Sequence, residues 1–103
     1  MRTARIFFDG ELAGYLTELD SKRFLFEYLE SYTGSSVSLT MPLSKRKFIY
    51  DSFPSFFDGL LPEGAQLDGL LRQNKIDRYD NFSQLLAVGA DLVGAVTVKA
   101  LEE

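Results

Sequence analysis

Residues 56–64 read Phe-Phe-Asp-Gly-Leu-Leu-Pro-Glu-Gly, and this stretch is expected to decide how the chain of 103 residues folds. Pro62 fixes its own φ angle and disfavours the helical region for Leu61, so a helix that begins near Pro54 should stop or kink there. Pro62 also suits the first turn of a new helix, with Glu63 placed where the helix dipole favours an anion. The stretch therefore predicts a helix–kink–helix corner that turns its large apolar residues toward something apolar.

The chain before this corner is predicted to form an antiparallel sheet. Strands are expected at residues 3–8, 11–18, 24–28 and 37–41, where apolar and β-branched residues alternate with polar ones. Asp9-Gly10 is a strong signal for a two-residue hairpin turn between the first two strands. Gly14 interrupts the second strand, which indicates a bulge or the close approach of another backbone.

The chain after the corner is predicted to be mostly helical. Pro62 to about Gln73 places three leucines on one face, and Asp80 or Asn81 is a candidate cap for a last short helix. Ser52 is a candidate cap for the earlier helix, with Pro54 in its first turn. Residues 93–101 are expected to return to the sheet as a strand. The fold class is therefore α+β, a single domain over residues 1–103 with a meander of about five strands, including the C-terminal one, and two or three short helices.

Residues 45–50 have two readings. Lys45, Arg46 and Lys47 form the only basic cluster, and Phe48, Ile49 and Tyr50 follow it directly. The apolar triplet is either a short edge strand or an exposed contact loop, and the basic residues are most simply a solvated loop tip.

The composition argues against several function classes. The chain has no Cys and no His, which removes thiolate metal ligands and the usual general base, and no cofactor is expected. The net charge is −4, and from residue 51 onward nine acidic residues face four basic ones, so direct nucleic-acid binding is not expected. No apolar run approaches the roughly 20 residues that span a bilayer, and residues 1–10 do not resemble a signal peptide, so a cytoplasmic location is expected.

Enzymatic motifs are also missing from the sequence. Gly64 and Gly69 have phosphate-loop spacing, but Leu70 and Leu71 stand where that motif needs Lys and Ser or Thr. Asp58 and Glu63 are more simply an exposed carboxylate and a helix-first-turn carboxylate than a catalytic pair. The chain is therefore not expected to be an enzyme.

The aromatic residues outnumber what one small core readily hides, with nine Phe and five Tyr. Phe24, Phe26, Phe82 and one of Phe56 and Phe57 are expected in the core. An exposed contact patch is expected to contain the following rings: Phe48, Tyr50, Phe53 and Phe57.

Four segments together resemble the N-terminal domain of HipA-type serine/threonine kinase toxins. They are residues 56–64, the run from Leu85 to Val96 with Gly89, Asp91 and Gly94, the opening hairpin, and Ser-Leu-Thr-Met-Pro-Leu at residues 38–43. The resemblance implies an accessory domain that packs against a kinase core and carries none of the kinase machinery.

The resemblance is greatest to HipS, the free-standing version of this domain in three-component toxin–antitoxin systems. It implies an antitoxin that binds and inhibits a HipT-like kinase, with a HipB-like DNA-binding protein in the same complex. The start of the first strand near Met1 and the Leu-Glu-Glu end favour a free-standing gene product. The expected contact residues are Lys45, Arg46, Phe48, Tyr50, Phe53, Phe57, Asp58, Leu61, Pro62 and Glu63.

Two other interpretations remain open at this point. The chain is alternatively the N-terminal accessory domain of a full-length HipA-like kinase. It is also readable as an unrelated small module that binds a peptide or an anion at the Gly89–Gly94 turn.

Overall fold

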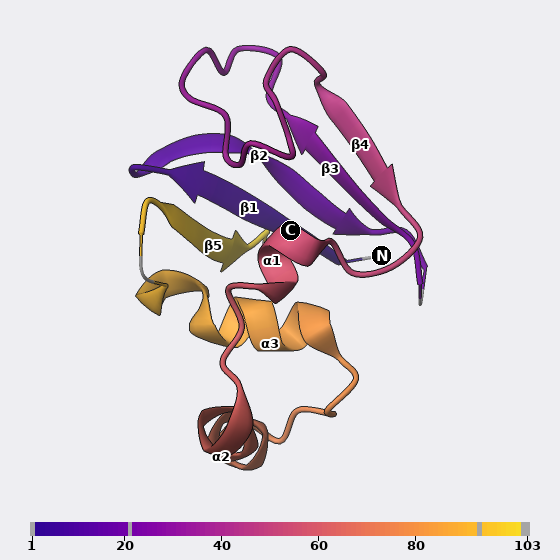
Figure 1. Ribbon diagram of the computed structural model, residues 1–103, viewed down its shortest axis with the longest axis vertical. Coiled ribbons are helices and arrows are strands. Elements are labelled where there is room, and N and C mark those ends of the chain that lie inside the picture. Colours follow the sequence, from indigo (N-terminus) through magenta and orange to yellow (C-terminus); the bar gives the residue numbers. More distant parts are fainter. Residues whose placement is uncertain (1, 21, 93, 102–103) are drawn as a thin grey trace.

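The computed structural model describes residues 2–20, 22–92 and 94–101, which form one antiparallel sheet with three α-helices. The elements in chain order are β1 (Arg2–Phe8), β2 (Glu11–Glu18), β3 (Phe24–Tyr28), β4 (Lys47–Tyr50), α1 (Ser55–Asp58), α2 (Gly64–Asn74), α3 (Asn81–Val88), a 3₁₀ turn (Gly89–Asp91) and β5 (Val96–Ala100). The strand order is β4-β3-β2-β1-β5, so β5 joins the free edge of the β1–β4 meander. Figure 1 shows α2 lying away from the sheet, with α3 between them. The predicted α+β class is confirmed.

The β1–β2 hairpin has the turn that its sequence predicts. Asp9 and Gly10 have φ values of 50° and 83°, as a two-residue turn that matches the strand twist requires. The register shifts after Ile6, which pairs with Gly14 while Phe7 pairs with Leu12. A Cβ at Gly14 would clash with the carbonyl oxygen of Glu27 on β3. Both expectations for Gly14, a bulge and a close backbone approach, are therefore confirmed.

The core lies on one face of the sheet, under α1 and α3. The alternating residues Phe24, Phe26 and Tyr28 all point into it and are buried. Phe57 of α1 is fully buried, with its ring centroid 5.8 Å from that of Phe26. Phe82 of α3 is also buried, so the expected core rings are confirmed and Phe57 is the corner residue that fills the core.

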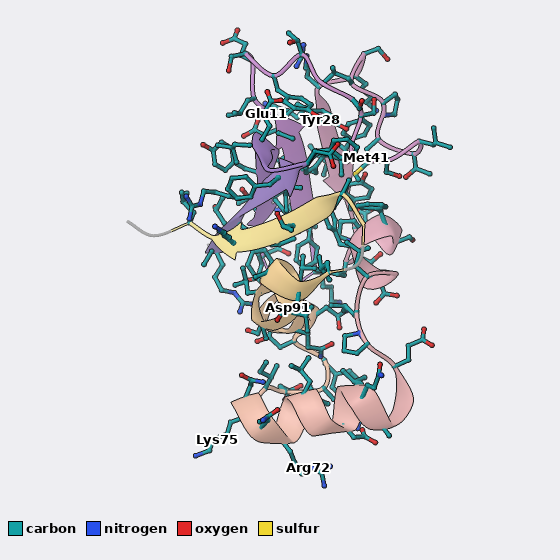
Figure 2. The ribbon with its side chains drawn as sticks, turned by 90° about the vertical axis from the view of Figure 1, so that its left-hand side faces the viewer. Glu11, Tyr28, Met41, Arg72, Lys75 and Asp91 are labelled. Carbon is teal, nitrogen blue, oxygen red and sulfur yellow. The ribbon has the colours of Figure 1, made fainter. Side chains whose placement is uncertain are left out.

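The predicted strand at residues 37–41 is wrong. This segment contains only an isolated bridge between Ser38 and Met41, and the fourth strand is β4 instead. The reason is the buried Tyr28 hydroxyl, which donates to the Met41 carbonyl oxygen (2.5 Å) and accepts from the Val37 amide (2.9 Å). A side chain therefore satisfies the backbone groups that a neighbouring strand would otherwise have bonded. Figure 2 shows Tyr28 and Met41 close together beside the sheet.

Two predicted helix boundaries need correction. The N-cap of α1 is Pro54, with no side-chain cap, so Ser52 does not cap it. Pro62 precedes α2 and does not begin it, because Glu63 is extended (φ −127°, ψ 163°) and Gly64 has a positive φ of 60°. Asp80 does cap α3, accepting from the Ser83 amide at 3.1 Å, as predicted.

The C-terminal strand is present but shorter than residues 93–101, and Val93 lies outside the described residues. Val96 and Val98 are buried on the core face of β5. Across the described residues, no helix is both long and apolar enough to cross a membrane.

Candidate interaction surface

The ten predicted contact residues do not form one continuous patch. Lys45, Arg46, Phe48 and Tyr50 belong to β4 and the loop before it. A second group consists of Asp58, the last residue of α1, and Leu61, Pro62 and Glu63, which lie between α1 and α2. Figure 1 places these two segments on different sides of α1. They are therefore treated as separate candidate surfaces.

The segment between α1 and α2 lines a hollow of about 400 Å³. Gly59, Leu60, Leu61, Pro62 and Gln66 form one side of it, and Val88, Asp91 and Leu92 form the other. Two of the four segments on which the HipA resemblance depends, residues 56–64 and 85–96, thus meet around one concave surface. Their apolar side chains are partly exposed there, as expected for a contact surface.

The backbone of this corner is held by its own hydrogen bonds. The Leu60 amide donates to the Phe57 carbonyl (3.1 Å), and the Leu61 amide donates to the Asp58 carbonyl (3.1 Å). Gly64 then supplies the left-handed φ that lets the chain turn from extended Glu63 into α2. Because tight turns and a glycine set the path, Leu61 and Pro62 are presented in a defined geometry.

One carboxylate, Asp91, lines this hollow, and two others, Asp58 and Glu63, flank in sequence the residues 59–62 that line it. Asp58, Glu63 and Asp91 are all exposed, and none has an ion-pair partner among the described residues. An apolar hollow with exposed acids in and beside its lining favours a partner surface that carries basic side chains around an apolar contact. Figure 2 shows Asp91 in the turn above α2.

The basic segment before β4 is largely occupied with contacts inside the domain. Arg46 donates from Nη1 to the carbonyl oxygens of Leu29 (3.1 Å) and Tyr32 (2.8 Å), which closes the long loop after β3. Lys45 lies over the Phe48 ring at 5.3 Å, and Lys47 pairs with Glu27 at 3.8 Å. These three basic side chains are exposed, as the interpretation of a solvated loop tip predicts. Arg46 also has a structural role, because it binds two backbone carbonyls of the loop.

The predicted exposed aromatic patch is wrong for two of its four members. Phe48 and Phe57 are buried, because both point to the core face where Phe26 lies between them. Tyr50 and Phe53 are partly exposed and line a smaller hollow of about 240 Å³ with Phe56. Burial raises the pKa of the Tyr50 hydroxyl, so this ring remains neutral at physiological pH.

A polar cluster around Arg2 was not predicted from the sequence. Its guanidinium donates to both carboxylate oxygens of Glu18 (2.9 and 2.8 Å), to Asp80 (2.9 Å) and to the Ser83 hydroxyl (2.7 Å). Arg2 also lies over the Phe82 ring at 4.8 Å. Since its partners are 16 to 81 positions away in the chain, no local sequence signal could have identified this cluster.

The Arg2 cluster forms part of an open cleft of about 530 Å³ that Tyr79 and Phe53 also line. Burial alone would raise the pKa of Asp80, but hydrogen bonds from Arg2 and Ser83 outweigh it and lower the pKa of this carboxyl below its ordinary value. Hydrogen bonds to Glu18 and Asp80 in turn raise the pKa of Arg2. The charged groups satisfy one another, so this cluster ties the sheet to the N-terminus of α3 and leaves no activated acid or base.

Across residues 2–20, 22–92 and 94–101, no cluster of three or more Asp or Glu side chains is arranged to hold a metal ion. The corner combines a hollow lined mostly by apolar residues with exposed carboxylates that have no ion-pair partner among these residues.

Comparison with known proteins agrees with the sequence resemblance. The family model of the HipA N-terminal domain matches residues 4–99. A solved structure described as the N-terminal domain of HipA toxin superposes with a TM-score of 0.79 at 30% identity, covering all of this chain and 95% of that one. An uncharacterized protein of Haemophilus influenzae (strain ATCC 51907 / DSM 11121 / KW20 / Rd) is 33% identical over 99 residues, which are 96% of this chain and 92% of the relative.

This family is linked to toxin–antitoxin systems, and its domain is the accessory part of HipA and not the kinase domain. The match extends over almost the whole described chain, from β1 through β5. The chain belongs to the HipA N-terminal domain family.

Proposed function

We propose that this domain is the antitoxin of a HipBST-type toxin–antitoxin system, which binds a HipT-like serine/threonine kinase and inhibits it. A HipB-like DNA-binding protein is proposed in the same complex. The proposal is supported by the family match over residues 4–99 and by the likeness to the N-terminal domain of HipA toxin. A domain of this family without kinase machinery acts on a kinase only by binding it.

Our assignment of the kinase contact site depends on one observation, the hollow between the α1–α2 corner and the 3₁₀ turn. Leu61 and Pro62 from one motif line it together with Val88 and Leu92 from the other. Asp91 in its lining, and Asp58 and Glu63 beside the lining residues in sequence, are exposed acids whose charge a basic kinase surface would complement. We therefore assign the kinase contact to Leu61, Pro62, Glu63 and Asp58, and leave buried Phe57 and Phe48 out of it.

Inhibition follows if the domain prefers one state of the kinase. A ligand shifts a conformational equilibrium only by the difference between its affinities for the two states. The docked domain would therefore either obstruct the nucleotide pocket or hold the phosphate-binding loop in an inactive arrangement. A tenfold preference for the inactive state corresponds to about 1.4 kcal/mol.

The test is copurification with the HipT-like kinase encoded beside this chain, followed by a kinase assay with and without the domain. The matched variants are Glu63→Lys at the corner and Glu11→Lys at the start of β2, since both side chains are exposed acids with no ion-pair partner among the described residues. We expect Glu63→Lys to weaken kinase binding about tenfold or more, and Glu11→Lys to change it less than about threefold. Unchanged kinase activity in the presence of the wild-type domain would exclude the antitoxin role.

A second candidate function is the N-terminal accessory domain of a full-length HipA-like kinase. The coverage of 95% of the N-terminal domain of HipA toxin favours it. The two are separated by supplying the domain in trans to cells that express the kinase. An antitoxin restores growth, whereas a domain that docks only within its own chain does not.

A further inference from the structure

The face of the sheet opposite the helices is uncovered, and its residues form regular rows across the strands. The pairings Lys99–Arg5, Arg5–Tyr15, Tyr15–Glu27 and Glu27–Lys47 place one row across all five strands. A neighbouring row contains Leu101, Thr3, Thr17, Leu25 and Ile49. Rows on one face of a sheet are about 7 Å apart.

Burial separates this face clearly from the core face. None of the residues in the two rows is buried, whereas the residues that alternate with them on β1 and β3 are. Ile49 is 67% exposed at one end of the aliphatic row, and Leu101 is 41% exposed at the other. Figure 2, in which the sheet is seen from its β5 edge, shows no helix on the side opposite α1.

Positive charge gathers at the β5–β1 end of this face. Arg5 and Lys99 both lie close to the Phe7 ring, at 5.8 and 5.6 Å from its centre. Lys47 at the other end pairs with Glu27, so Arg5 and Lys99 are the cations left for a partner. Arg5 and Lys99 therefore form a local excess of positive charge in a chain whose net charge is −4.

Arg5 also has an unmet hydrogen-bond donor. Its Nε is screened from water and has no acceptor among the described residues, while its Nη2 donates weakly to the Ala100 carbonyl at 3.3 Å. A screened donor without an acceptor costs about 1–3 kcal/mol. A carboxylate that paired with this guanidinium would satisfy it, because carboxylates match the fork of N–H groups in arginine.

We infer that this uncovered face, the open sheet face, is a second docking surface, and that it takes an acidic amphipathic segment of a partner protein. Glutamate or aspartate side chains would lie on Arg5 and Lys99, and aliphatic side chains would lie on Leu25 and Ile49. This surface is on the opposite side of the sheet from the corner, so the domain can contact two partner segments at once. The inference goes beyond the proposed antitoxin function and does not need it.

A protein segment fits this face better than single-stranded nucleic acid does. One of the two rows is aliphatic or threonine and offers no stacking platform for bases. The ring of the other row, Tyr15, pairs directly with Glu27, whose charge would repel the phosphates of a strand stacked there. A second copy of this chain fits less well than an acidic segment, because stacking the charged row on itself about Tyr15 would oppose Lys99 to Lys47 as well as Arg5 to Glu27, so repulsion would offset attraction.

The test is a titration of the ¹⁵N-labelled full chain with a synthetic peptide in which leucine and glutamate stripes repeat at helical spacing. We expect saturable amide shifts at Arg5, Lys99, Leu25 and Ile49, with a dissociation constant below about 1 mM. The exposed substitutions Lys99→Glu and Ile49→Lys should each weaken binding about threefold to tenfold. Glu63→Lys at the corner is the control and should leave peptide binding unchanged.

Several results would overturn the inference. One is the absence of saturable shifts on the open sheet face, and another is equal binding of the same peptide with lysine in place of glutamate. Stronger shifts of these amides with a thymidine oligonucleotide would assign the face to nucleic acid. Shifts of these amides on dilution of the chain alone would assign it to self-association. A failed kinase assay together with normal peptide titration would reject the antitoxin role and leave this inference standing.

Discussion

The two halves of the 56–64 segment are adjacent in sequence but lie in opposite environments. The first half contributes Phe57, which is fully buried, with its ring 5.2 Å from Phe56 and 5.8 Å from Phe26. The second half contributes Leu61 and Pro62, which are partly exposed, and Glu63, which is exposed. One motif thus combines residues that build the core with residues that are available to a partner.

This difference matters for interpreting any mutation in the motif. Loss of kinase binding after replacement of Phe57 would report on folding, because the ring does not reach the surface. Loss of binding after replacement of Glu63 would report on the contact itself. The comparison can be tested at three places, in order of decreasing effect on stability.

The largest effect is expected from Phe57→Ala, which removes a fully buried ring from between α1 and β3. Such substitutions destabilise proteins by about 3–5 kcal/mol, through lost burial and the cavity that remains. Urea unfolding followed by circular dichroism measures it. Glu63→Ala in the same segment should change the free energy of unfolding by less than about 0.5 kcal/mol. Similar changes in the free energy of unfolding for the two variants would contradict the division of the motif into a buried half and an exposed half.

An intermediate effect is expected from Gly64→Ala, where the second half of the motif turns into α2. The φ of 60° is strained for alanine, so we expect a loss of about 1–2 kcal/mol in the free energy of unfolding. Gly69 in the same helix is the matched control, because it has no positive φ and nothing lies within 4 Å of the position that an alanine Cβ would take. Gly69→Ala should stabilise the domain by up to about 1 kcal/mol. If Gly64→Ala stabilised the domain, the backbone would have to enter α2 without a positive φ at residue 64.

The smallest effect concerns α3, whose end supports the second half of the motif and whose start is tied to the sheet by Arg2. The folded-state pKa of Asp80 lies below its ordinary value of 3.8, so its charge stabilises the fold above that pH. The contribution is lost as the pH falls through the lowered pKa. Because the ion pair is partly exposed, Asp80→Asn should cost only about 0.5–1 kcal/mol near neutral pH.

The pH series supplies the control for this prediction. The difference between wild type and Asp80→Asn in the free energy of unfolding should shrink below pH 3.8. Asparagine retains the N-cap acceptor, so the variant isolates the charge. A difference that stayed constant down to about pH 2 would show that the Arg2 cluster contributes through geometry alone.

Local sequence signals predicted those elements whose causes are local. Asp9-Gly10, Gly14 and the alternation at residues 24–28 each fix their structure through turn geometry, backbone space or side-chain period, and each prediction is confirmed. The strand at residues 37–41 failed because the distant Tyr28 hydroxyl takes its backbone groups. The helix start at Pro62 failed because Gly64, with its positive φ, moves the first turn two residues along the chain.

The candidate surfaces were only partly predictable for the same reason. The HipA resemblance pointed to residues 56–64 and 85–96, and the fold brings them together around one hollow. Which ring of Phe56 and Phe57 faces inward depends on how α1 meets β3, and that is a tertiary property. The Arg2 cluster and the open sheet face arise from pairings across the sheet, so no short window of the sequence contains them.

The position of α2 has a consequence for how such a domain can diversify. This helix has no buried residue, and a residue with a left-handed φ stands at each end, Gly64 as its first residue and Lys75 directly after its last. Figure 2 shows Arg72 and Lys75 directed away from the rest of the molecule. The exposed positions of α2 can therefore change without repacking the sheet, so this helix is a place where sequence variation would leave the scaffold intact.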